Sequence, residues 1–533
     1  FRLYASEEVD GLYFALPTRV AARELYARVL TAIEAAFDSE DRPCPVILAA
    51  PGYVRVDGQP MLPDSFGVLW DDNVLDRRRE KYWSAERPKR FLAAPIGVGT
   101  VDQALLSVLQ VKHSLLRSVC LDRHLLVVDE VHASDAYMRE VLCALISGHV
   151  GRGGWVLLLS ATLGESAAAR FLGRELMTLT NALRRPYPLL TSRSDNYAMV
   201  TLRKRCLDVE LSPSLNDDDA LVPRLLAALR QGARVMVICN TVTRANTLFR
   251  RIEAVLEAEQ PELLEAVLNL KGIRCPHHGR FARADRELLD AAVSAALGKY
   301  SQPGARLLIG TQTLEQSLDI DADWLVTDLA PMDVLLQRFG RLHRHPREDR
   351  PAVFATPQAC VRVPAADLSG YLRSDGSFRG PAGLGSVYVD GRVLMLTLSE
   401  LMRRPRLSLP EDARTLIEYT THPEVLAAMS PNWRAHGAHI EGKDLAEVRL
   451  ALTSVLDELP FGELHYADKS ERIVTRLGQP SFDLSLQTPR ESAFGATIDR
   501  VIVPAHWVPE GVTPEIVSAE VTEAGFRFDV ATK

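Results

Sequence analysis

Short apolar runs that end on polar residues recur along this 533-residue chain and constrain its fold more than any other feature. Such runs of about four to eight residues are typical of strands buried on both faces. Segments with helical spacing lie between them, as in residues 19–37. Buried strands separated by helices form parallel sheets with right-handed crossovers, so we predict an α/β protein. The runs are residues 11–16, 125–128, 155–159, 234–239, 306–310 and 324–327.

The composition agrees with several folded domains. The chain is 47% hydrophobic and 25% charged, which is close to the globular average. At roughly 150 residues per domain, its length suggests about three or four domains. We expect a first α/β domain over residues 1–192 and a second over 193–355, then a loop and helical connector over 356–455 and a small C-terminal accessory domain over 456–533.

Charge, cysteine content and hydropathy exclude several classes of protein. No run of about 18 uncharged apolar residues is present, and no signal peptide opens the chain. Seven cysteines, an odd number and never in C-x-x-C pairs, indicate reduced thiols. We therefore expect a cytoplasmic protein without a membrane segment. The net charge of −7 argues against a generally basic surface, although nucleic-acid contact needs only a local basic track.

Polar residues directly follow two of the apolar runs. Asp129, Glu130 and His132 come after residues 125–128, and a carboxylate pair at a strand end suits nucleoside triphosphate hydrolysis. In that interpretation Asp129 holds Mg²⁺ through water and Glu130 polarises the attacking water. A solvated charged turn is the alternative. Ser160 and Thr162 end the next run, where their hydroxyls could bridge the carboxylate turn and a bound strand.

A second polar set lies in the later α/β segment. Arg341 and Arg344 are three residues apart, which places them on one face if they lie in a helix. Two guanidinium groups there suit the arginine-finger role toward a γ-phosphate, and a solvated basic helix end is the alternative. Thr311 could bind a phosphate of a nucleic-acid strand, and Asp319 a ribose or the Mg²⁺-bound nucleotide. A polar helix N-terminus is the alternative for both.

Hydroxyl-bearing strand ends also occur at Pro17-Thr18-Arg19 and at Thr241. Backbone amides and hydroxyls in such positions grip phosphates without reading bases. His277-His278 could suggest a metal site, but no cluster of further ligand-type residues stands beside the pair in the sequence. We therefore interpret it as bordering the nucleic-acid path or packing in the core.

Together these motifs resemble the superfamily 2 helicases of the DExH type. The matching segments are Pro17–Arg19, Asp129–His132, Ser160–Thr162, the strand to Thr241, Thr311–Asp321 and Gln337–Arg344. More narrowly, the chain resembles the CRISPR-associated helicase–nuclease family of type I systems. Residues 98–106, 111–113 and 129–138 carry that likeness, which covers residues 1 to about 350.

The resemblance implies two RecA-like domains with ATP and Mg²⁺ between them and single-stranded DNA across their tops. It implies 3′→5′ translocation that unwinds target DNA exposed by a Cascade-type CRISPR effector complex and feeds it to an HD nuclease. It assigns catalysis to Asp129, Glu130, His132, Gln337, Arg341 and Arg344, and nucleotide binding to Asp319 and Gly340. It assigns nucleic-acid binding to Pro17, Thr18, Arg19, Thr100, Thr241 and Thr311, and coupling to Ser160 and Thr162.

Two parts that the resemblance implies do not occur in this sequence. None of the nine lysines completes a G-x-x-x-x-G-K-[ST] loop, whose amides and lysine bind the phosphates. None of the 13 histidines precedes Asp, as the HD nuclease motif requires. The chain begins with Phe1, so we expect a truncated first domain and little ATP hydrolysis by this chain alone.

Three hypotheses remain open at this stage. The chain is the helicase motor of a longer protein, a non-hydrolysing nucleic-acid-binding scaffold, or another DExH helicase that acts on RNA. The sequence preceding Phe1 separates the first two, and the nucleic acid that stimulates ATP hydrolysis separates the first and third.

Overall fold

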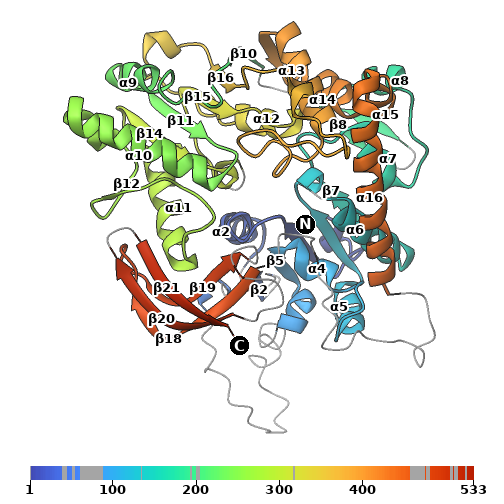
Figure 1. Ribbon diagram of the computed structural model, residues 1–533. Coiled ribbons are helices and arrows are strands. Elements are labelled where there is room, and N and C mark those ends of the chain that lie inside the picture. The colour runs from blue at the N-terminus through green and yellow to red at the C-terminus, as the bar shows by residue number, and fades with distance from the viewer. Residues whose placement is uncertain are drawn as a thin grey trace. The chain divides into compact units, whose positions relative to one another are not determined.

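The computed structural model divides into two compact units (Figure 1). The first comprises residues 1–163, 167–176 and 441–477, and the second residues 164–166, 177–440 and 478–533. Phe1 and three residues within the motif ranges given above, Ser134, Gln316 and Ser317, lie outside the part of the chain that the structure describes. The described residues are 2–38, 42, 45–50, 54–60, 88–133, 135–192, 195–199, 204–315, 318–456, 475, 481–504, 508, 514–522 and 525–532.

Among the described residues, the first unit is built on a seven-stranded sheet in the order β4-β3-β2-β5-β1-β6-β7. β1 lies near its centre, parallel to β5 on one side and to β6 on the other. β2 and β7 continue the parallel part, whereas β3 and β4 are short and antiparallel. The predicted parallel sheet is confirmed. The strands are β1 Gly11–Leu16, β2 Val46–Ala49, β3 Arg55–Val56, β4 Gln59–Pro60, β5 Ile96–Thr100, β6 His124–Val128 and β7 Trp155–Leu158.

Both faces of this sheet are covered. In β2, Val46 and Leu48 pack in one hydrophobic cluster with α2, whereas Ile47 and Ala49 pack in a second cluster with α6. Alternate residues thus enter opposite cores, which explains why the strands are continuous apolar runs. The helices are α1 Arg2–Ala5, α2 Arg19–Ala36, α4 Val101–Leu105, α5 Ser114–Leu121, α6 Ala136–Gly151 and α7 Glu165–Leu172, with 3₁₀ turns η2 Pro88–Ala93 and η3 Val131–Ala133.

In the described part of the second unit, the main sheet has six strands in the order β14-β11-β15-β16-β10-β17. Its neighbouring strands are parallel except β17, which runs antiparallel to β10. β11, β14 and β15 follow the predicted runs, but β16 and β17 lie beyond residue 355, where we placed the end of the second domain. The strands are β8 Leu189–Thr191, β9 Asn196–Ala198, β10 Arg205–Ser212, β11 Arg234–Ile238, β12 Asn269–Leu270, β13 Ile273–Arg274, β14 Arg306–Gly310, β15 Trp324–Asp328, β16 Gln358–Arg362 and β17 Arg406–Leu409.

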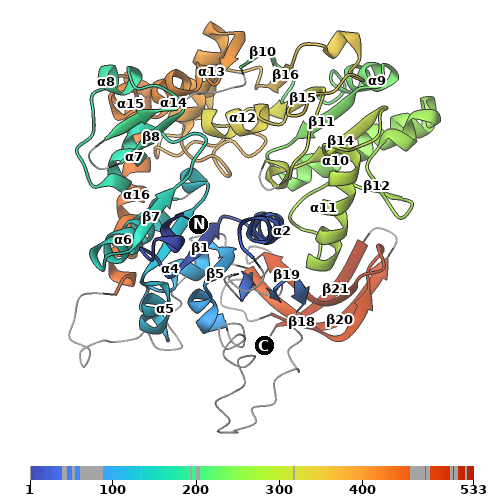
Figure 2. The same ribbon diagram turned by 180° about the vertical axis from the view of Figure 1, so that it is seen from behind.

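Helices surround this sheet, with α9 against β11, and α10 and α11 against β14 (Figures 1 and 2). The predicted loop and helical connector, residues 356–455, contains α13 to α16. The helices are α8 Leu179–Leu183, α9 Val222–Arg230, α10 Val242–Glu259, α11 Arg283–Leu297, α12 Met332–Phe339, α13 Gly391–Arg403, α14 Ala413–Thr421 and α15 Pro423–Ala427. A further helix, α16 Arg434–Ser454, begins in the second unit, and its residues from 441 on belong to the first. The 3₁₀ turns are η4 Pro261–Ala266, η5 Gln312–Leu314, η6 Ala352–Phe354, η7 Leu368–Tyr371 and η8 Pro431–Trp433.

The C-terminal residues form two antiparallel hairpins, β18 Ser481–Glu491 with β19 Thr497–Pro504 and β20 Pro514–Thr522 with β21 Gly525–Thr532. Figures 1 and 2 show them beside α11. The turn of the first hairpin packs on the rest of this unit through Phe494, which lies in a small cluster with Cys275 and Leu289. The Lys271 ammonium donates a hydrogen bond to the Phe494 carbonyl at 2.6 Å.

Gly310 ends β14 where another segment approaches closely. A Cβ atom at this position would lie 2.5 Å from the His277 carbonyl oxygen and 2.6 Å from Leu314 Cδ1. We expect Gly310→Ala to lower the free energy of unfolding by about 1–3 kcal/mol, because a well-packed site must shift to admit the methyl group. Denaturant unfolding measures the change. Gly370→Ala is the matched control, since its Cβ would meet nothing within 4 Å; equal losses in both variants would contradict the explanation.

Candidate functional site

The turn after β6 holds the predicted carboxylates in a defined geometry. The Asp129 amide donates to the Ala15 carbonyl at 3.0 Å, which ties the turn to β1. Asp129 Oδ1 accepts the Glu130 amide at 2.9 Å. Burial raises the pKa of Asp129, and this hydrogen bond opposes the rise. Glu130 has a φ of 55°, a left-handed conformation that is strained for a residue with a side chain and that is often found at functional sites.

His132 joins the ends of β6 and β7. Its Nδ1 lies 2.9 Å from Ser160 Oγ and 3.2 Å from Glu130 Oε2. The imidazole is 6% exposed and the Glu130 side chain is 30% exposed, although its Oε2 atom, which faces His132, is buried. Ser160 Oγ also accepts the Thr162 amide at 3.3 Å. The sequence motifs at the two strand ends are therefore one hydrogen-bonded group.

The hydroxyls predicted to contact nucleic acid begin helices. Thr18 caps α2 by accepting the Ala21 amide at 3.1 Å, and Thr241 caps α10 by accepting the Arg244 amide at 3.3 Å. Capping uses the oxygen as an acceptor and leaves the hydroxyl proton for another partner. Pro17 and Arg19 flank Thr18, and Arg19 is exposed. Thr100 precedes α4 and is buried, without a side-chain cap bond.

The prediction that Arg341 and Arg344 share one helix face is wrong. α12 ends at Phe339 with Gly340 as its C-cap, and both arginines lie beyond it. Arg341 instead donates to the carbonyls of Glu315 and Leu318, at 2.5 and 2.6 Å. Gln337, in the last turn of α12, donates to the Asp333 carbonyl at 3.4 Å.

Arg344 pairs with Asp319 at 2.6 Å, and both side chains are about half exposed, at 42% and 54%. Burial raises the pKa of Asp319, but the hydrogen bond and charge of Arg344, with His345, outweigh this and hold it below the usual value. Two residues predicted to meet a nucleotide are therefore adjacent on the surface of the second unit.

Sequence reasoning missed Arg338, which is completely buried in α12. Its guanidinium donates to Glu315 Oε1 at 2.7 Å, to Asn240 Oδ1 at 3.2 Å and to the Tyr388 hydroxyl at 2.8 Å. Arg338 thus connects α12 to Asn240 after β11, to Glu315 after η5 and to Tyr388 before α13. A signal was present, because Arg338 is in helical phase with buried Leu335.

A second missed network supports the same loop. Asp321 and Asp323 are fully buried. Asp321 Oδ2 accepts from Arg347 and Arg350, each at 2.7 Å. Asp323 Oδ2 accepts the Arg234 amide at 2.8 Å. Buried carboxylates persist only when they are paired in this way, so the loop around Arg344 is anchored at the start of β15.

His277 and His278 are both buried, at 1% and 7% exposure. His277 is hydrogen-bonded to Asp290 and Thr313, and His278 to Asn246 and to the backbone amide of Arg280. Within the described residues, no group of three or more His, Cys, Asp or Glu side chains could hold a metal ion. No helix in that part of the chain has the length and apolar character needed to cross a membrane.

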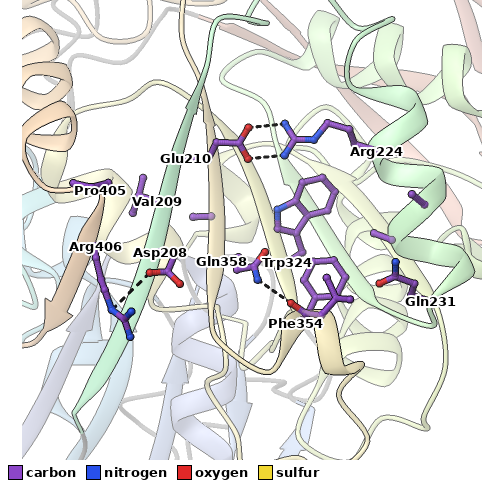
Figure 3. Close-up of a pocket in the computed structure, with 14 residues that line it drawn as sticks. Asp208, Val209, Glu210, Arg224, Gln231, Trp324, Phe354, Gln358, Pro405 and Arg406 are labelled. Atoms are coloured by element: carbon purple, nitrogen blue, oxygen red, sulfur yellow. Dashed lines mark hydrogen bonds and ion pairs between the residues drawn. The ribbon is translucent and has the colours of Figure 1, made fainter.

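A pocket of about 600 Å³ lies away from these motifs, at the amino ends of β15 and β16 (Figure 3). Its floor holds Trp324, stacked on Phe354 with ring centroids 6.0 Å apart. Arg224 lies 5.4 Å from the Trp324 ring and binds the Glu210 carboxylate at 2.9 and 2.6 Å. Both arginines that line the pocket are paired with carboxylates, Arg224 with Glu210 and Arg406 with Asp208. None of the predicted site residues lines it.

Comparisons with known proteins agree with the motifs. A family model described as "CRISPR-associated nuclease/helicase Cas3, C-terminal" matches residues 231–347. The chain is 29% identical over 510 residues to the CRISPR-associated endonuclease/helicase Cas3 of Escherichia coli, covering 91% of this chain and 53% of that protein. It is 31% identical over 534 residues to the protein of the same name from Thermus thermophilus, covering 88% and 55%.

Comparison with solved structures agrees with the fold described above. The crystal structure of T. fusca Cas3 superposes with a TM-score of 0.69 and 26% sequence identity, over 89% of this chain and 53% of that chain. The prediction of two RecA-like parallel-sheet domains is thereby confirmed. The chain spans about half the length of the curated relatives that it matches. It belongs to the family of CRISPR-associated Cas3 nuclease/helicases.

Proposed function

We propose that this chain is the motor part of an ATP-driven helicase that translocates 3′→5′ along single-stranded DNA. The observation that carries the proposal is the position of His132, whose Nδ1 is hydrogen-bonded to Ser160 Oγ and lies 3.2 Å from Glu130 Oε2, so that it joins the ends of two neighbouring parallel strands. Ligands of parallel sheets bind at such carboxyl ends. Relatives named endonuclease/helicase, and a structure described as T. fusca Cas3-ATP, support the reaction class.

In the first unit, Asp129 and Glu130 have different roles in hydrolysis. Glu130 orients and polarises the attacking water, and His132 holds the carboxylate through Nδ1. Asp129 fits a role toward Mg²⁺, because carboxylate oxygens are the ligands this ion prefers and its Oδ2 does not take the Glu130 amide. When bound, the ion neutralises charge on the phosphates. Ser160 and Thr162 transmit the state of this site to the bound strand.

In the second unit, we propose that Arg344 and Arg341 stabilise charge on the γ-phosphate, with Gln337 and Gly340 shaping the loop that presents them. Asp319, beside Arg344, receives the nucleotide. Thr241 and Thr311 bind the phosphates of the DNA strand, as Pro17, Thr18, Arg19 and Thr100 do in the first unit. The strand is thus held by contacts that do not depend on base sequence.

We further propose that the phosphate-binding loop and an HD nuclease are supplied by sequence outside this chain. A Cascade-type CRISPR effector complex would present the target DNA, and the motor would feed it to the nuclease. Within the chain, the domain limits 1–192, 193–355, 356–455 and 456–533 remain our proposal, except that β16 and β17 complete the sheet of the second domain.

The test is ATP hydrolysis by a longer protein that contains this chain and a G-x-x-x-x-G-K-[ST] loop. We expect single-stranded DNA to stimulate hydrolysis at least about tenfold, RNA to stimulate it far less, and a duplex with a 3′ single-stranded tail to be unwound. This chain alone should hydrolyse ATP at a small fraction of that rate, because the loop supplies the phosphate-binding lysine. Stimulation by RNA alone would favour the RNA helicase, and no hydrolysis in the longer protein would favour a binding scaffold.

A further inference from the structure

The segment that follows Ser160 and Thr162 passes directly from one compact unit to the other. Residues 160–163 belong to the first unit, whereas residues 164–166 belong to the second, together with α14. α7 begins at Glu165, and its residues from 167 on belong to the first unit again. The chain thus enters the second unit for three residues, directly after the strand end that holds Thr162.

Glu418 of α14 holds these three residues in place. The Glu165 amide donates to Glu418 Oε1 at 2.9 Å, although the two residues are 253 positions apart in the sequence. Arg414, one turn earlier on α14, donates to the same oxygen at 3.1 Å. The Glu165 and Glu418 side chains are fully buried. A carboxylate at a helix N-terminus binds an amide that has no partner within the helix, so Glu418 caps α7 from another element.

Packing and a second carboxylate fix the same segment. A Cβ atom at Gly164 would lie 2.9 Å from Thr421 Oγ1 and 3.1 Å from Ile417 Cγ2, so the backbone lies directly against α14. Glu165 Oε1 accepts the Met177 amide at 3.1 Å, at the point where the chain enters the second unit again. Residues 164–166 are therefore held by their backbone, by close packing and by a buried side chain.

The other end of α7 is anchored in the first unit. Phe171 packs in the hydrophobic cluster that includes α6. Arg170 Nε donates to Glu140 Oε1 on α6 at 2.8 Å. The first turn of α7 is thus attached to α14 and its last turn to α6, so a shift of α14 acts on the short link that follows β7.

α14 also packs against α12, the helix that precedes Arg341 and Arg344 (Figures 1 and 2). α12 is in turn tied to the end of β11, where Arg338 donates to Asn240, the residue before Thr241. Close-packed helices shift together, because protein interiors have low compressibility and transmit strain. A displacement of the proposed DNA and phosphate contacts of the second unit is therefore passed through α12 to α14.

We propose that Glu418 is a positioning residue that couples DNA binding by the second unit to the hydrolysis turn after β6. The path runs from α12 to α14 and through the hydrogen bond between Glu418 and Glu165 to Thr162. The Thr162 amide binds Ser160 Oγ, which lies 2.9 Å from His132 Nδ1. The inference rests on the proposed function, because it gives the coupling assigned to Ser160 and Thr162 a physical link.

The test measures steady-state ATP hydrolysis, with and without single-stranded DNA, in the longer protein that contains this chain and a phosphate-binding loop. Glu418→Ala is expected to lower the DNA-stimulated rate at least about fivefold, the lower end of the usual coupling between two sites. The rate without DNA and the affinity for nucleotide should stay within about twofold of the wild type, because no residue of the hydrolysis site is changed. Glu418→Gln keeps an acceptor oxygen for the Glu165 amide and should restore most of the stimulation.

Gly164→Ala disturbs the same contact without removing a charge. Its Cβ would push the segment away from α14, so we expect the same selective loss of DNA stimulation. This variant decides the question if Glu418→Ala, which removes a buried partner of Arg414, does not fold. Glu424→Ala is the matched control. Glu424 Oε1, on α15 of the same unit, accepts the Leu179 amide at 3.2 Å, so the variant loses the same kind of hydrogen bond outside the proposed path and should follow the wild type.

The failure of this inference and the failure of the proposed function look different. If the folded variants, Gly164→Ala alone or with Glu418→Ala, keep the wild-type stimulation, the inference is overturned and the motor stands. An equal loss of the rates with and without DNA, together with a lower unfolding midpoint, would also overturn it, since Glu418 would then only stabilise the fold. If single-stranded DNA does not stimulate the wild-type longer protein, the proposed function itself fails.

Discussion

Replacing Glu130 by Gln is expected to lower kcat for ATP hydrolysis by about 10²–10⁴-fold, the usual share of a positioned general base. Glu130 is the partly exposed end of the group that includes His132 and Ser160, so it is the member that can reach an attacking water. Gln keeps the size of the side chain and the strained backbone, but it cannot polarise that water. ATP should still bind, because the substitution leaves Asp129 in place.

The measurement combines steady-state hydrolysis with direct nucleotide binding in the longer protein. Glu34→Gln is the control, since Glu34 is an exposed carboxylate on α2 of the same unit. It should leave both quantities unchanged. Turnover by Glu130→Gln within about threefold of the wild type would refute the assigned role.

Replacing Arg344 by Ala is expected to reduce kcat by about 10³-fold or more, as the loss of an arginine finger does in related reactions. The guanidinium is 42% exposed, and its carboxylate partner Asp319 is more exposed still. A surface ion pair of this kind contributes about 0–1 kcal/mol to folding, so the variant should remain folded. A large loss of rate would therefore report on chemistry rather than on stability.

The chain offers a matched control for this variant. Arg251 forms a comparable exposed pair with Asp219 at 2.8 Å in the same unit. Arg251→Ala should lose that pair without a change in kcat, and the unfolding midpoints of both variants should agree. Arg341→Ala is a poorer probe, because Arg341 also holds the carbonyls of Glu315 and Leu318. Equal rates for Arg344→Ala and Arg251→Ala would remove Arg344 from the mechanism.

The sequence was most informative where strands are covered on both faces. β14 has the same bounds as the apolar run that predicted it. A strand whose two faces are both covered has apolar residues at consecutive positions, so it stands out in the sequence. β10 escaped notice because it alternates, with Leu207 and Val209 buried and Glu210 exposed, and we searched for continuous runs. β16 lies in a stretch rich in Pro and Gly, so its buried residues Cys360 and Val361 were not recognised as a strand.

The polar interior could not be predicted in the same way. Arg234 and Arg338 are completely buried, which is rare for arginine and depends on carboxylates that the fold brings to them. Asp323 is 89 residues from Arg234 in the sequence, so no local sequence pattern could predict that the two residues pair. The carboxylate turn, by contrast, follows its strand directly, and its partners stand at the end of the next strand. Because these residues follow two neighbouring strands directly, this part of the site could be predicted from the sequence.

The left-handed backbone of Glu130 means that the residue best for stability at this position differs from the residue that the proposed function needs. A glycine would adopt that conformation with little penalty, relieving strain on the order of 1 kcal/mol or more, but it would remove the carboxylate. At position 130, glycine would therefore favour the stability of the fold, whereas glutamate supplies the carboxylate that we propose for hydrolysis. Under the role that we propose for Glu130, a relative that does not hydrolyse ATP would gain stability from glycine at this position.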